Sequence, residues 1–178
     1  MSKKQKTLSF DEFADELLLE RQPRALIILA AAHIDIQLRD IIETFLWPKA
    51  GKQKDNDEIL DGDSPLSTFS SRINMTHRLG LIDHELRRNL HKLRDIRNQA
   101  AHWTVFGVQS APLRDQLRDL CSDIQKGRPY HLTSSKYFGE AKLTEMESLK
   151  AVMLTLGARL GSIAAAKRSI CPPTVKDS

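Results

Sequence analysis

The sequence predicts an all-α fold, a single-domain bundle of about six helices. Apolar residues recur at helical spacing along most of the chain, and no stretch shows the apolar–polar alternation of a strand. The 178 residues fit one domain. An aromatic content of 6%, with 8 glycines and 7 prolines, is too low for a turn-rich sandwich.

The first helix is expected to begin at Phe10. Ser9 and Glu12 have the spacing of a capping box, in which each side chain accepts the backbone N–H of the other residue. The residues before the box, 1–8, are predicted to form a basic, flexible N-terminus.

A second, longer helix is expected from Pro23 to about Trp47. Proline suits the first turn, because its missing N–H would have no partner there. Pro48 disfavours helical geometry in the residue before it, so the helix should end there. Residues 25–32 are apolar on every side, which predicts that this half of the helix is fully buried at the centre of the bundle.

The middle of the chain should hold a loop followed by two helices. Residues 49–63 are polar and aperiodic, so they are expected to form an exposed loop. Ser64 and the proline after it are the expected cap and first residue of the next helix, which should stop at Gly80. Asp83 is the expected cap of a further helix that continues to about His102.

Two more helices are expected in the last third of the chain. One begins near Ser110 and ends at Gly127, before a second irregular loop over 127–139 whose glycines and proline favour turns. The other begins at a capping box headed by Thr144 and runs to about Arg168.

The helical domain should therefore span residues 9–170, followed by a tail over 171–178. The longest apolar run, 25–32, falls short of the roughly 20 residues that cross a bilayer, so no contact with a membrane is expected. No apolar stretch follows the basic start, so no secretory signal is expected. Cys121 and Cys171 have neither metal-ligand spacing nor a disulfide framework, which favours the cytoplasm.

Charge is distributed unevenly along the chain. Residues 10–64 hold 13 acidic and 6 basic side chains, whereas residues 72–97 hold 7 basic and 3 acidic ones. The overall net charge of +4 permits contact with nucleic acid. No compact block of lysine and arginine with interleaved aromatics supports it, so nucleic acid stays an open partner class without a motif.

The most informative segment is 93–102. The apolar row that contains Leu90 and Leu93 continues at the same spacing to Arg97, which places a guanidinium on a buried face. Such a group is costly unless it is paired or reaches water, so Arg97 is expected to anchor a buried polar network or to line a cleft. The candidate members of a structural polar network are Ser67, Arg72, Arg97 and Asn98.

A catalytic interpretation of the same segment is a ribonuclease site. Arg97 would hold the scissile phosphate, His102 would move a proton, and Asn98 would orient one of them. Arg97 and His102 lie about 140° apart on an ideal helix. They would converge only where the helix ends or where two chains pack about a two-fold axis, which makes a homodimer part of this hypothesis.

A third interpretation makes residues 83–97 a DNA recognition helix. Arg87, Arg88 and Arg94 would then point outward, after a turn at 79–83 that resembles a helix-turn-helix linker. The alternative is the ordinary solvated face of an amphipathic helix.

No cofactor and no metal site are expected. His84 and His91 lie seven residues apart, without a partner at metal-ligand spacing. The hydroxyl-rich stretch 61–73 matches no phosphate-binding loop, and the serines lack the nucleophile elbow of hydrolases. Cys121 lies among apolar neighbours and is interpreted as a small core residue.

Three blocks of the sequence carry a resemblance to a known family. They are GDSPLSTFSSRI at 62–73, LGLI at 79–82 and IRNQAAH at 96–102. In order and spacing they resemble the mannitol operon repressor (MltR) family, over roughly residues 24–102. The Arg97-Asn98-x3-His102 pattern is also similar to that of HEPN-type helical domains, many of which are dimeric, metal-independent ribonucleases.

The resemblance implies an all-helical, bacterial cytoplasmic regulator of transcription, without a standard DNA-binding motif. It therefore favours a non-enzymatic repressor that acts through a protein partner, with a homodimer left open. The HEPN-like ribonuclease that uses Arg97, Asn98 and His102 across a dimer interface is the alternative. The working surface would be either the basic region 72–97 or the acidic first third of the chain.

Overall fold

A computed structural model describes residues 8–46, 57–102 and 111–166 of the protein. The all-α prediction is confirmed, with seven helices in the described ranges and no strand there. The helices are α1 (Phe10–Leu19), α2 (Pro23–Glu43), α3 (Phe69–Arg78), α4 (His84–His102), α5 (Ala111–Gln125), α6 (Arg128–Phe138) and α7 (Glu145–Ala165). None of the described helices is both long and apolar enough to cross a membrane.

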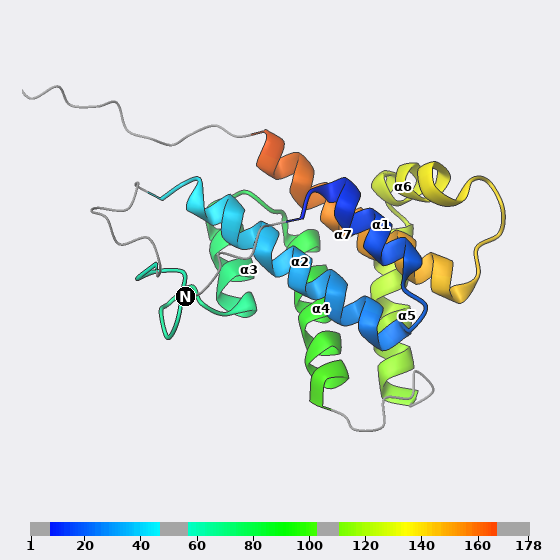
Figure 1. The fold of residues 1–178 in the computed structure, drawn as a ribbon, viewed down its shortest axis with the longest axis horizontal. Helices are drawn as coiled ribbons and strands as arrows, with labels where there is room; N and C mark the ends of the chain where they lie inside the picture. Colours follow the sequence, from blue (N-terminus) through cyan, green and yellow to red (C-terminus); the bar gives the residue numbers. More distant parts are fainter. Residues whose placement is uncertain (1–7, 47–56, 103–110, 167–178) are drawn as a thin grey trace, which may run out of the picture.

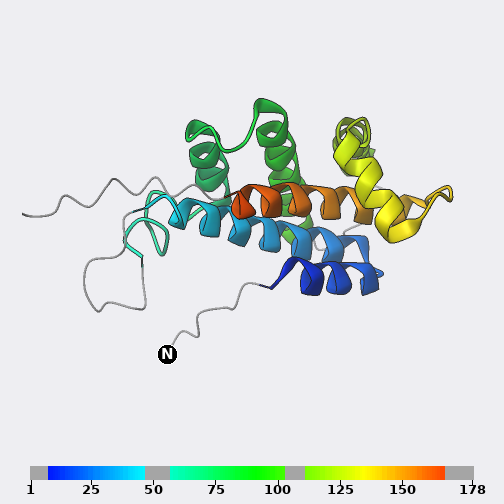
Figure 2. The ribbon, with the colours of Figure 1, turned by 90° about the horizontal axis from the view of Figure 1, so that it is seen from above.

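Two long helices, α2 and α7, form the centre of the bundle. They pack against each other along their length, and α1 lies across one side of the pair (Figure 1). Seen from above, α3, α4 and α6 lie on the opposite side, while α4 and α5 pack together (Figure 2). The hydrophobic core runs between these layers and draws on every helix.

Three predicted caps are confirmed. Ser9 and Glu12 exchange hydrogen bonds of 3.2 and 2.8 Å at the start of α1. The box headed by Thr144 starts α7, and Asp83 Oδ1 accepts the N–H of Leu86 at 2.7 Å at the start of α4. Caps join residues only three apart in the chain, so the local sequence carried the signal for these three. The predictions that concern residues 1–7, Trp47, 49–56, Ser110, Arg168 and 171–178 lie outside the described residues.

The prediction that residues 25–32 are fully buried is wrong. Leu26 and Ile27 are buried, but Ile28 and Leu29 are half-buried and Ala32 is exposed. The reason is that Ala25, Ile28, Leu29 and Ala32 share one side of α2, beside the end of α1, which the neighbouring helices leave partly uncovered. Helix α2 also ends earlier than expected, at Glu43.

Helix α3 starts later than the sequence predicted. Ser64 does not cap it; its hydroxyl donates to the carbonyl of Ile59 at 2.7 Å and closes a turn of the preceding segment. Thr68 is the cap, and it forms a capping box with Ser71. The predicted stop is confirmed, because Gly80 has φ +72°, a left-handed conformation that side chains rarely adopt.

The predicted irregular loop over 127–139 is also wrong, because most of it forms α6. Pro129 sits in the first turn of the helix, where a proline initiates rather than breaks it. Gly139 ends the helix with φ +75°. Tyr130 and Thr133 point toward the bundle and are buried, which anchors this short helix on α7.

Candidate functional site

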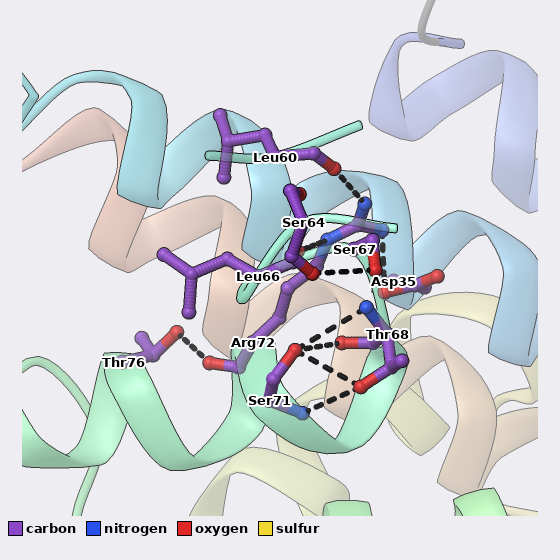
Figure 3. A network of polar contacts seen from close by, with 9 residues as sticks. All are labelled: Asp35, Leu60, Ser64, Leu66, Ser67, Thr68, Ser71, Arg72 and Thr76. Carbon is purple, nitrogen blue, oxygen red and sulfur yellow. Dashed lines mark hydrogen bonds and ion pairs between the residues drawn. The ribbon is translucent and has the colours of Figure 1, made fainter. Parts of the chain in front are cut away.

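Among the described residues the buried arginine is Arg72, which is 8% exposed. Its guanidinium donates to the Asp35 carboxylate at 2.9 Å and to the carbonyls of Leu66 and Leu60 at 2.9 and 3.0 Å (Figure 3). Arg72 therefore joins α3 to α2 and fastens the segment 57–68 to both. Burial raises the pKa of the Asp35 carboxyl, and the neighbouring Arg72 offsets part of that rise.

The segment 57–68 is held by its own acidic residues as well. Asp57 Oδ1 accepts the backbone N–H groups of Ile59 and Leu60 at 2.9 and 3.2 Å, which forms a tight turn. Asp61 Oδ2 accepts the N–H of Asp57 at 2.9 Å and the guanidinium of Arg39 at 3.1 Å. These carboxylates of the acidic first third thus bind groups of the chain itself.

The predicted polar network divides into two places. Ser67 lies beside Arg72 in Figure 3, but its hydroxyl donates to the carbonyl of Ser64 at 2.8 Å. Arg97 donates to the side chain of its neighbour Asn98 at 3.2 Å. No hydrogen bond between described residues connects that pair to Arg72, although Arg97 lies close enough to help lower the pKa of Asp35.

The expected burial of Arg97 is wrong, because its side chain is exposed. Helix α4 crosses α2 at a steep angle (Figure 1), so the side of α4 that is covered changes along its length. Leu90 is buried early in the helix, whereas Ile96 and Ala100, on the other edge of the apolar stripe, are buried later. His102, the last residue of α4, is exposed too.

A row of basic and imidazole side chains lies along the contact between α3 and α4, where most of them are half-buried. We call it the α3–α4 basic face and define it as His77, His84, Arg87, His91 and Arg94. Its α4 members recur every three or four residues, so they share one side of the helix. Asn98 continues the row, and its hydrogen bond draws Arg97 toward the end of the face.

Polar side chains of α3 hold this face in place. Asn74 Oδ1 accepts hydrogen bonds from Nε and Nη2 of Arg87 at 3.2 and 3.1 Å, and it lies 3.1 Å from His91 Nε2. Ser70 Oγ accepts Nη1 of Arg94 at 2.8 Å. The sequence did not single out Asn74 or Ser70, because no local pattern says which α4 side chains an α3 residue will meet.

Arginine carries the charge of the face at neutral pH. Desolvation and the neighbouring Arg94 and Arg87 lower the pKa of His91. Desolvation, followed by His84 and Arg87, lowers the pKa of His77, whose ring nitrogen lies 3.2 Å from that of His84. An anion bound here would oppose these effects, so it would raise both pKa values and favour proton uptake.

The recognition-helix interpretation required three outward arginines on one face of α4. Arg87 and Arg94 share the side that faces α3, but Arg88 points to the other side and pairs with Asp123 of α5 at 3.1 Å. Lys92 also binds Asp123, at 2.9 Å, and this hydrogen bond lowers the pKa of the Asp123 carboxyl. The three arginines therefore do not form one row.

No group of three or more metal-ligating side chains occurs among the residues that the structure describes. Cys121 is largely buried, and burial raises the pKa of its thiol to about 11. It is therefore protonated near neutral pH and is not a nucleophile in this state.

Comparisons with known proteins support the fold of the chain but identify no family for it. No family model and no curated protein matches the sequence. One similar solved structure is a possible transcriptional regulator, YggD, from Shigella flexneri 2a str. 2457T, with a TM-score of 0.61 and 13% identity over 90% of this chain and 98% of that one. Another is a chain of the MtlR–HPr complex from Escherichia coli, with a TM-score of 0.58 and 16% identity over 87% and 98%.

Proposed function

We propose that this protein is a cytoplasmic transcriptional regulator of the mannitol operon repressor type, which acts by binding a partner protein rather than by reading DNA directly. The observation that carries the proposal is the α3–α4 basic face, in which two arginines, held in place by Asn74 and Ser70, lie in one row with three imidazoles. An acidic surface on the partner is the complementary surface.

The choice between the two candidate surfaces follows from what their charges already bind. In the acidic first third, Asp35 and Asp61 bind Arg72 and Arg39 of the chain itself. On the basic face, the hydrogen bonds that Arg87 makes go to the neutral side chain of Asn74. Arg94 donates to Ser70 and also pairs with the carboxylate of adjacent Asp95. The positive charge of Arg87 is therefore the one most available to a partner.

A protein fits this face better than a nucleic acid. Base-stacking side chains such as Phe, Tyr and Trp are absent from the five residues of the face, and single-stranded nucleic acid usually needs them. Two of its five side chains, His77 and His91, are mostly uncharged at neutral pH, because their pKa values are lowered. The MtlR–HPr complex among the structural neighbours supports a protein partner and makes an HPr-type protein the first one to test.

Reversing the charge of the face should weaken partner binding. We expect Arg87→Glu with Arg94→Glu to reduce the affinity for HPr of the host organism at least about tenfold, measured by titration calorimetry, because two cation–carboxylate contacts are replaced by repulsion. Lys142→Glu is the matched control, since it makes a charge reversal at an exposed site on the α6–α7 connection and should leave the affinity unchanged. Equal affinity in both variants, or no binding of HPr to the wild type, would contradict the proposal.

A second candidate function is a metal-independent ribonuclease. The observation that favours it is that Arg97 and His102 are both exposed at one end of α4, and that Asn98 contacts Arg97. Exposure is what a phosphate ligand and a proton-transfer group require. A second copy of the chain would have to bring the two residues together across an interface.

This candidate has its own test. If it holds, dimeric fractions from size-exclusion chromatography should cleave labelled RNA in EDTA, and His102→Ala should slow cleavage about 100-fold through loss of proton transfer. His131→Ala, at an exposed site of α6, is the control and should cleave like the wild type. Intact RNA after incubation with the wild type would remove the ribonuclease from consideration.

A further inference from the structure

A cavity of about 430 Å³ lies between α5, the first turns of α7 and the first residue of α2. Its floor is apolar and is made by Leu117, Cys121, Met146 and Leu149. The volume lies within the range of small-molecule sites, roughly 300 to 1,000 Å³. The cavity shares no residue with the α3–α4 basic face.

The polar groups of this cavity lie at its wall and rim. In the wall, Gln125 Nε2 donates to Ser148 Oγ at 2.6 Å, and the Ser148 hydroxyl can still donate its own hydrogen. At the rim, Arg114 and Arg118 stand one turn apart on α5 and both are exposed. Glu145 is the carboxylate among the lining residues, so cations outnumber anions around the opening.

The charges of the rim are weakly compensated within the chain. Arg118 contacts Asp115 at 3.4 Å, but both side chains are well exposed, so this pair is weak. The floor carries no charge near neutral pH, because burial raises the pKa of the Cys121 thiol to about 11. The cavity thus combines a neutral, apolar interior with a cationic opening.

We propose that this cavity binds a small organic acid. The carboxylate lies between Arg114 and Arg118, and the hydrocarbon body packs against Leu117 and Leu149. A guanidinium pair recognises a carboxylate through charge-assisted hydrogen bonds, while an apolar floor selects for a ligand with an apolar body.

Two other hollows in the described part of the chain are less suited to such a ligand. One lies over the uncovered side of α2, beside Leu19, and is bordered by Glu16, Glu20 and Arg21, so its anions outnumber its cations and disfavour a carboxylate ligand. The other contains Arg159, whose guanidinium already binds Asp83 at 3.0 Å and Glu85 at 3.4 Å.

Titration calorimetry with octanoate and with octan-1-ol tests the chemistry of the site. We expect one octanoate per chain, bound at least about tenfold more tightly than octan-1-ol, because only the acid reaches the guanidiniums as an anion. Arg114→Gln with Arg118→Gln should abolish that preference and leave the helical circular dichroism unchanged. The matched control, Arg128→Gln, removes an exposed arginine at the start of α6 and should keep the preference.

A labelling experiment tests the location. In the Cys171→Ser variant, Cys121 is the remaining cysteine of the sequence. Octanoate should slow its reaction with N-ethylmaleimide in a saturable way, with the midpoint that calorimetry gives. Octanoate binding without protection of Cys121, equal affinity for octanoate and octan-1-ol, or no saturable octanoate binding would each overturn the proposal.

Discussion

Replacing Arg72 with methionine is expected to lower the free energy of unfolding by about 3 kcal/mol, near the lower end for a broken buried ion pair. Methionine keeps the apolar stem of the side chain but removes the donors to Asp35 and to the carbonyls of Leu60 and Leu66. Those acceptors lose their partner inside the protein. The Asp35 side chain is 28% exposed, so water can solvate part of its charge, which places the cost at the lower end of the range.

Urea unfolding of the purified protein measures this loss. Arg118→Met is the control, because the Arg118 side chain is 71% exposed and its contact with Asp115 should contribute no more than about 0.5 kcal/mol. Adding Asp35→Asn to Arg72→Met should recover part of the loss, since the unpaired carboxylate is then gone. A loss below about 1 kcal/mol for Arg72→Met alone would show that the network contributes little to stability.

The same substitution should have a local effect that a general loss of stability would not produce. Arg72 fastens the segment 57–68, whose backbone includes the hydrogen bonds from Asp61 to Asp57 and from Leu66 to Ile59. We expect hydrogen exchange of these amides to become much faster in Arg72→Met, while the central amides of α7 keep their order of protection. Equal acceleration in both regions would mean that Arg72 acts on the whole bundle instead.

The contrast between Arg72 and Arg97 shows what the sequence can and cannot predict about the candidate site. Arg97 was expected to be buried because it continues the helical spacing of Leu90 and Leu93, and that rule assumes one covered side along the whole helix. The crossing of α4 over α2 changes the covered side, which a single helix cannot indicate. Arg72 is buried because two carbonyls of a non-helical segment reach it, and such acceptors follow no periodic pattern.

Local signals predicted most of the fold. They could not decide whether a given glycine or proline ends one helix or begins the next. The capping boxes of α1 and α7 were identified because their partners are three residues apart, but the box of α3 at Thr68 was missed. Gly127 and Pro129 can end one helix or begin another, and the structure shows that they begin α6. The cavity beside Cys121 combines residues of α2, α5 and α7, from Pro23 to Leu149, and these residues share no motif.

Lowering the pH from 7 to about 4 is expected to cost the protein up to about 3 kcal/mol of stability through His33 alone. His33 is 5% exposed, and its ring stacks on that of Phe13, with 3.9 Å between centroids and 3° between planes. Gly157 of α7 allows this stack, since a Cβ there would lie 3.0 Å from the Phe13 ring. Burial lowers the pKa of His33 from 6.5 to about 4.

The direction of the effect follows from which state of the protein, folded or unfolded, binds the proton more readily. Between pH 6.5 and about 4 the unfolded chain protonates His33 while the folded protein does not, so protonation favours unfolding. The contribution of His33 to the free energy of unfolding is fully present above pH 6.5. It is lost between pH 6.5 and about 4 and does not change further at lower pH. His33→Leu should therefore flatten the pH profile of the unfolding free energy by that amount, because leucine binds no proton. His131→Leu, at an exposed site on α6, should keep the wild-type slope, whereas identical slopes for His33→Leu and the wild type would contradict the assignment.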